Sequence, residues 1–182
     1  MSAFLLRSLT LVGILATLAH AHPLPDIPVR SHFAQDGTCI IKVEIDPRCF
    51  TAEPETERYM MKADLLVLTE QEKKELIQKA TDALQSWVQF EFDPKGKLQP
   101  RFDFALTGIN EGPLTKADDP MVITGTWKMQ IPAETRGWRI HATDKTPFAI
   151  VFRNYMAGVE QPRFSVLFPG ETSFELELTT AK

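Results

Sequence analysis

The sequence predicts a mainly β fold: an antiparallel, immunoglobulin-like β-sandwich of about nine strands with one packed amphipathic helix over about 70–87. Short segments in which apolar and polar residues alternate recur at the spacing of about 8–12 residues that is typical of such sandwiches. One segment alone has the apolar period of a helix. Because strong alternation gives each sheet one buried face, it favours two sheets packed face to face.

The first two strands form the most clearly marked hairpin of the chain. Residues 27–33 and 39–45 both alternate, and Asp36-Gly37 between them is a tight-turn signal. Asp46-Pro47 ends the second strand, since proline cannot donate to a sheet ladder. Residues 46–58, with two prolines and mixed charge, are predicted to form a loop.

The two cysteines, Cys39 and Cys49, are predicted to be free thiols. In an exported protein a disulfide is the default expectation. An extended strand from Cys39 to residue 46, however, carries the chain roughly 23 Å at about 3.3 Å per residue. The few residues after the strand cannot return Cys49 to within the roughly 7 Å between Cα atoms that a disulfide requires.

The predicted helix begins at a capping box. The Thr69 hydroxyl and the Glu72 carboxylate can each satisfy a backbone donor of the other residue. Apolar residues then recur at helical spacing, at Leu76, Ile77, Ala80, Ala83, Leu84 and Trp87, and charged residues occupy the other side. The preceding segment, 59–67, is ambiguous, and we expect a helical turn there.

Alternation returns at Val88 and continues to the end of the chain. Residues 88–92 and 102–106 flank a turn at Asp93-Pro94-Lys95-Gly96 and predict a second hairpin. Further strands are predicted at 123–131, 138–142, 148–152, 164–168 and 174–178, with the apolar residues of each, among them Phe164, Val166 and Phe168, on its buried face. Residues 108–120, polar and rich in turn residues, form the longest predicted loop of this half.

The first residues predict export. Arg7, an apolar run from Leu9 to Leu18 and small residues before a cleavage position together indicate a signal peptide over 1–21. The run is about half the roughly 20 residues that span a bilayer, and no later run is long enough. We therefore expect 22–182 to be a single extracytoplasmic domain, periplasmic or secreted, with no membrane span. Cleavage after Ala21 is favoured, and cleavage after Ala19 stays open.

Composition and motifs disfavour several function classes. The chain has a formal net charge of −4 and no cluster of Lys and Arg, so nucleic-acid binding is not indicated. It has no Gly-x-Ser-x-Gly elbow and no His-Glu-x-x-His motif, which favours a non-enzymatic protein. Trp87, Trp127 and Trp138 lie on the apolar phase of their elements, so core packing is favoured over a sugar-binding platform.

The new amino terminus is a candidate metal site. After the favoured cleavage, the free α-amine and the imidazole of His22 can chelate one metal ion through two nitrogens. A third nitrogen, from His32 or His141, would complete a site suited to copper. The other cleavage would instead leave His20-Ala21-His22, a triplet that can wrap Cu(II) or Ni(II) in a square plane. The alternative is that His22 only begins a flexible, proline-rich leader.

The loop 108–120 is the second candidate site. Its polar residues Asn110, Glu111, Asp118 and Asp119 are the first candidates for contact with a ligand or partner. On this interpretation the chain is a structural or adhesive β-sandwich that binds protein or glycan through its loops. On the leading interpretation it is an exported binding or accessory domain that handles a transition metal, copper or nickel, for a membrane partner.

Three short stretches, His22–Pro28, Ile41–Asp46 and Val166–Glu171, carry a resemblance to a known family. They resemble the small extracytoplasmic domain found beside, or fused in front of, HupE/UreJ-type membrane proteins, which are thought to be nickel or cobalt permeases. The resemblance implies a periplasmic accessory domain and, since no membrane segment follows Lys182 in this sequence, one that works with a separate membrane protein. Only His22 carries over from the family as a candidate ligand.

Overall fold

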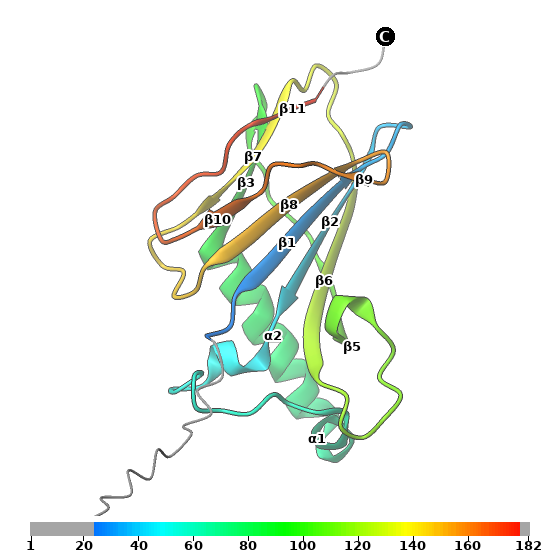
Figure 1. Cartoon of the computed structure of the whole chain (residues 1–182), viewed down its shortest axis with the longest axis vertical. Coiled ribbons are helices and arrows are strands. Elements are labelled where there is room, and N and C mark those ends of the chain that lie inside the picture. The colour runs from blue at the N-terminus through cyan, green and yellow to red at the C-terminus, as the bar shows by residue number, and fades with distance from the viewer. Residues whose placement is uncertain (1–23, 179–182) are drawn as a thin grey trace, which may run out of the picture.

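A computed structural model describes residues 24–178, which form two β-sheets connected by helices and loops (Figure 1). The larger sheet contains β1 (Ile27–Phe33), β2 (Thr38–Ile45), β5 (Asp103–Gly108), β6 (Met121–Gln130), β8 (Ile150–Met156), β9 (Val159–Glu160) and β10 (Ser165–Leu167). The smaller sheet contains β3 (Val88–Asp93), β4 (Gly96–Lys97), β7 (Gly137–Ala142) and β11 (Leu176–Glu177). The predicted signal peptide and His22 lie outside the described residues.

The fold is mainly β, as the alternation predicts, and the first hairpin is confirmed. The larger sheet has the strand order β10-β8-β1-β2-β6-β5, with β9 paired to β8, and the smaller sheet has the order β11-β7-β3-β4. The described residues form eleven strands rather than about nine. Strands of two residues, such as β4 and β9, are too short to show an alternation of apolar and polar residues. β1 and β2 pair antiparallel, with Val29 opposite Val43.

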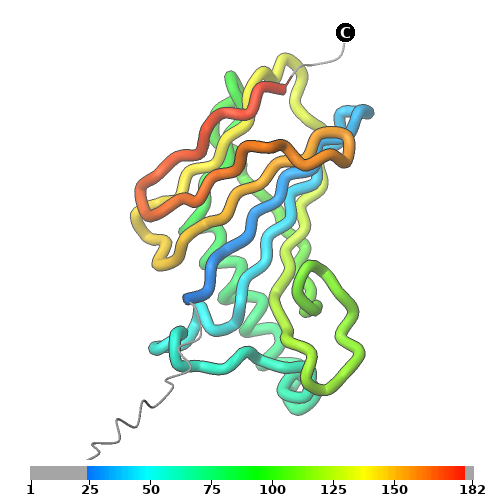
Figure 2. The backbone as a smooth tube through the Cα atoms, viewed as in Figure 1, coloured from blue at the N-terminus to red at the C-terminus, as the bar shows by residue number. Residues whose placement is uncertain are grey.

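β1 also pairs with β8, and this pair is parallel, which the expected antiparallel arrangement did not include. The register places Ile27 opposite Ile150 and Phe33 opposite Met156. Figure 2 shows the result: the blue tube of β1 lies between the tubes of β2 and β8, although β8 belongs to the far end of the chain. The first described strand is therefore a central strand of the larger sheet.

The predicted helix is confirmed at both ends. α2 spans Glu70–Trp87, and its capping box is present: the Thr69 hydroxyl accepts from the Glu72 backbone N–H at 3.2 Å, and the Glu72 carboxylate accepts from the Thr69 N–H at 2.7 Å. The expected helical turn in 59–67 is a short helix, α1 (Lys62–Val67). Two 3₁₀ turns, η1 (Pro47–Phe50) and η2 (Ile109–Glu111), lie in segments predicted as loops. Within residues 24–178 there is no helix with the length and apolarity needed to cross a membrane.

The core lies between the two sheets and is rich in aromatic side chains. Trp138 of β7 is fully buried and packs against Phe92, with ring centroids 4.6 Å apart, and against Phe152 of the other sheet at 6.5 Å. α2 continues the layer of the smaller sheet and leads into β3 (Figure 1), with Ala80 and Leu84 in the same core. All three tryptophans pack in or against this core, as expected for core residues.

The predicted second hairpin is wrong. β3 pairs with β4 and β7 in the smaller sheet, whereas β5 pairs with β6 in the larger one. Between them the chain crosses from one sheet to the other, and Phe102 packs in that crossing against Phe90, with ring centroids 5.8 Å apart. Alternation shows which side chains of a strand are buried but not which sheet the strand joins, and both segments bury aromatic residues in the shared core.

Both cysteines are free, as predicted, and both are buried. Cys39 lies near the start of β2, and Cys49 lies in η1, beyond the other end of that strand. Burial raises the pKa of both thiols to about 12. The thiolate form, which is the reactive one, is therefore strongly disfavoured in the folded protein.

Candidate binding surface

Strand β10 and the two residues that flank it expose side chains that the sequence predicts to be buried. Phe164, Val166 and Phe168 are 51%, 45% and 58% exposed, whereas Leu167 is 3% exposed. The reason is the register with β8, which puts Leu167 opposite the buried Ile150 and so turns its neighbours to the outer face, away from the core. We refer to Phe164, Val166 and Phe168 as the apolar ridge.

Next to the apolar ridge, three cationic side chains cross the outer face of the larger sheet. Arg30 of β1 lies in register with Arg153 of β8 on one side and with Lys42 of β2 on the other. Neighbouring strands are about 4.8 Å apart, so the Cα atoms of these three residues span about 10 Å. We call Arg153, Arg30 and Lys42 the cation row. It meets the apolar ridge at Arg153, whose guanidinium lies 5.0 Å from the centre of the Phe164 ring.

Each side chain of the cation row has an acceptor. Arg30 donates to the Glu44 carboxylate at 2.6 Å and, through its other terminal nitrogen, to the Asn110 amide oxygen at 2.7 Å. The Lys42 ammonium lies 2.7 Å from the Glu111 carboxylate. Arg153 donates to Glu160, in β9, at 2.5 Å. Glu44 and Glu160 therefore belong to strands of the larger sheet, whereas Asn110 and Glu111 come from a loop that folds over it.

The loop after β5 is closed at its neck by a backbone hydrogen bond, and its tip, which contacts the cation row, is strained. The Gly108 N–H donates to the Gly112 carbonyl at 2.9 Å, and a Cβ on Gly108 would lie only 2.8 Å from that oxygen, so this neck requires glycine. At the tip, Asn110 and Glu111 both have left-handed backbone conformations, with φ of 55° and 59°. For Glu111 this conformation costs about 1–2 kcal/mol. Exposed ion pairs such as Lys42–Glu111 contribute about 0–1 kcal/mol each, so the tip is only weakly held.

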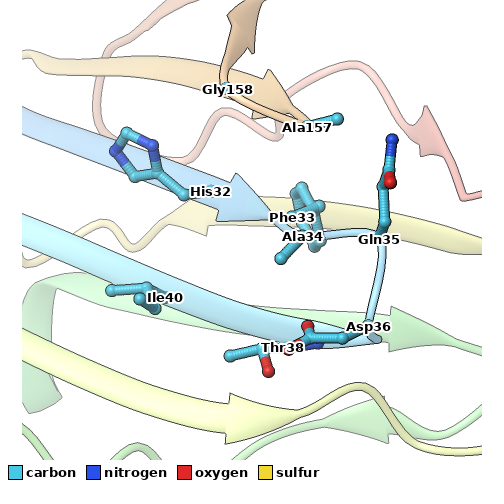
Figure 3. A pocket seen from close by; sticks show the side chains of 9 residues that line it. All are labelled: His32, Phe33, Ala34, Gln35, Asp36, Thr38, Ile40, Ala157 and Gly158. Carbon is cyan, nitrogen blue, oxygen red and sulfur yellow. The ribbon is translucent and has the colours of Figure 1, made fainter.

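A pocket of about 560 Å³ opens beside His32, at the end of the same outer face (Figure 3). The His32 ring stacks on Tyr155 of β8, with centroids 4.4 Å apart and planes 11° apart. His32 and Ile40 form one end of the pocket, and Asp36 and Thr38 lie toward the other (Figure 3). Burial, and then the nearby Lys42 charge, lower the pKa of His32 from its ordinary value, so the imidazole is mainly neutral at pH 7.

The structure does not bring the predicted metal ligands together. His32 lies on the outer face of the larger sheet, whereas His141 lies on β7 of the smaller sheet, with its Nδ1 3.0 Å from the Thr172 hydroxyl. His22 is outside the described residues, and the leader joins β1 at the end opposite His32, about 17 Å away along the strand. Within residues 24–178, no group of three or more His, Cys, Asp or Glu side chains is placed to hold a metal ion.

The four predicted loop residues divide into two pairs. Asn110 and Glu111 contact the cation row. Asp119 instead accepts from the backbone N–H groups of Thr115 and Lys116, both at 2.6 Å, and stabilises its own turn. Asp118 is exposed and has no ion pair within the described part of the chain.

Sequence reasoning missed the cation row and the exposure of the apolar ridge. Alternation in the first hairpin already places Arg30 and Lys42 on the polar face, so these two members of the cation row could have been predicted from the sequence. Arg153 joins them only through the parallel pairing of β1 with β8, which no local signal indicates. No protein-family model matches the chain, and no curated protein is similar enough to be identified as a relative.

Proposed function

We propose that this chain is an exported, non-enzymatic binding or accessory domain that binds a protein partner through the outer face of its larger sheet. The proposal includes an immunoglobulin-like β-sandwich as the fold, which the two sheets around one shared core support. It also includes an extracytoplasmic location, which rests on the signal-like residues 1–21.

The observation that carries the proposal is the exposure of the apolar ridge. Scattered exposed apolar residues are ordinary, but Phe164, Val166 and Phe168 lie together along β10 and the residues directly before and after it. Aromatic residues and arginine are the side chains most enriched at protein interfaces, and the ridge adjoins Arg153. The loop residues Asn110 and Glu111 lie on the same surface, so the ridge, the cation row and the loop form one continuous contact area.

A membrane protein is the partner that the family resemblance implies, and we retain it in the proposal. Copper or nickel handling also stays part of it, through His22 at the new amino terminus. The described residues add no metal ligands to His22, so protein binding, and not metal binding, leads the proposal.

Site-specific photo-crosslinking tests this function. A photoreactive residue replaces Val166 on the apolar ridge, and in a matched control it replaces Lys97, which is exposed on the smaller sheet. We expect the Val166 form, expressed with its own signal in the native host, to crosslink to a protein of the membrane fraction, and the Lys97 form not to do so. Equal labelling from both positions, or none from Val166, would contradict the proposal.

A further inference from the structure

We propose that the cation row binds an acidic, extended segment of the partner, and that the loop tip at Asn110 and Glu111 occupies this site as a built-in competitor. The inference rests on the proposed function, because it names the chemistry of the same binding surface. Of the four loop residues that the sequence singles out, Asn110 and Glu111 are the two that reach the larger sheet within the described part of the chain, and the inference gives them a role.

The loop tip presents to the sheet what an acidic peptide would present. Consecutive residues, Asn110 and Glu111, offer an amide oxygen to Arg30 and a carboxylate to Lys42, each at 2.7 Å. The contacts join positions far apart in the sequence, so the tip meets these cations as a separate segment would. An incoming peptide can therefore replace both acceptors without leaving a cation unpaired.

The pairs that must exchange are accessible, and the pair that must remain is buried. The side chains of Lys42 and Glu111 are 28% and 35% exposed, whereas the Glu44 side chain beneath Arg30 is 5% exposed. Arg30 can thus keep Glu44 and exchange only Asn110. Because Glu111 holds a backbone conformation that is unfavourable for a non-glycine residue, release of the tip relieves strain and favours the exchange.

The geometry also indicates how the segment lies. The cation row runs across the strands for about 10 Å, which an extended peptide covers in about three residues. Side chains two positions apart share one face of an extended chain and lie about 7 Å apart, so carboxylates at that spacing would reach Arg153 and Lys42 through these long side chains. At the Arg153 end, the Phe164 ring lies next to the path, so an apolar residue beyond the acidic ones can pack on the apolar ridge.

The experiment measures binding of a fluorescein-labelled hexaglutamate peptide to the full mature protein by fluorescence anisotropy at low salt. The test variant, N110G/E111A, empties the site; glycine suits the left-handed conformation of position 110. D118A removes an equally acidic residue of the same loop that does not touch the cation row. We expect N110G/E111A to bind about three- to tenfold more tightly than wild type, D118A to match wild type, and K42Q added to the double variant to remove the gain.

Three results would overturn the inference. The first is equal peptide affinity for N110G/E111A, D118A and wild type while thermal melting shows all three folded. The second is equal binding of a hexalysine peptide. The third is variant-dependent binding of vesicles that contain anionic lipid without any binding of the peptide, which would assign the cation row to a membrane surface. If N110G/E111A leaves the peptide affinity unchanged but the Val166 position still crosslinks, only this inference fails. If N110G/E111A raises the peptide affinity but the Val166 position gives no crosslink, the proposed function fails.

Discussion

The indole Nε1 of Trp138 donates a hydrogen bond of 3.1 Å to the Ser31 hydroxyl, and this bond joins the inner faces of the two sheets. Both residues are fully buried. Ser31→Ala leaves the indole N–H buried without this acceptor, and we expect it to lower the free energy of unfolding by about 1–3 kcal/mol. Urea denaturation measures the change, with Ser165→Ala in strand β10 as the control. A Ser31→Ala stability equal to wild type would show that the bond contributes nothing.

The buried ion pair of η1 predicts a larger effect. Arg48 and Asp46 lie 2.8 Å apart with side chains 3% and 9% exposed, and the guanidinium packs 3.9 Å from the centre of the Tyr59 ring. Asp46→Asn retains an acceptor for the Arg48 backbone N–H but removes the charge that balances the guanidinium. We expect a loss of about 3 kcal/mol, compared with less than about 0.5 kcal/mol for the exposed Asp118→Asn. Similar midpoints in urea for the two variants would contradict the expectation.

The buried thiols predict an alkylation pattern and a pH dependence. Without reductant, iodoacetamide should add nothing to the native protein and label both Cys39 and Cys49 in denaturant, as mass spectrometry would show. Labelling that requires prior reduction would mean a disulfide. The raised thiol pKa of about 12 means that the folded state keeps protons which the unfolded state releases near its ordinary value of 9. The resulting stability is present below about pH 9 and lost as the pH rises toward 12.

His32 predicts a second pH dependence, in the acid direction. Burial and the Lys42 charge lower its pKa below the ordinary value of 6.5, so on acidification the unfolded chain takes up a proton before the folded one. Stability should fall as the pH drops below about 6.5, and His32→Gln should reduce that fall. Urea denaturation at about pH 5 and pH 8 measures both forms, and NMR titration of the imidazole gives the pKa. An identical loss in wild type and His32→Gln would contradict the expectation.

Copper titration tests the amino-terminal site. Mature protein that begins at His22 should bind Cu(II), and a form with one extra residue before His22 should bind it more weakly, because the α-amine no longer chelates together with that imidazole. His32→Gln and His141→Gln should leave the affinity unchanged, since these residues lie on different sheets and the leader joins β1 away from His32. Equal affinity for the mature and extended forms would remove the amino-terminal site. The mass of the mature protein decides between the two cleavage positions.

Elements set by neighbouring residues were predictable from the sequence. The reciprocal bonds of Thr69 and Glu72 fix the start of α2, and Asp36-Gly37 fixes the turn of the first hairpin. In both cases the deciding interactions join residues only a few positions apart, so the local pattern contains them. The free cysteines followed from the same local reasoning, because an extended β2 separates them.

Elements set by distant partners were not predictable in this way. Phe164, Val166 and Phe168 alternate as a buried strand does, but only the pairing of Leu167 with Ile150 decides which face of β10 meets the core. The candidate surface has the same origin, since Arg153 and Arg30 become neighbours through a parallel pairing and Asn110 reaches Arg30 through a folded loop.

The central position of β1 determines the order in which the protein can assemble. The β1–β2 hairpin can form early, but the other edge of β1 has no partner until β8 has been synthesised, because Ile27 pairs with Ile150. Such long-range pairing slows folding, and an unpaired edge is a site for aggregation while it lasts. A nascent chain that stops before residue 150 therefore exposes an adhesive strand, so a truncated product should depend on chaperones or be degraded.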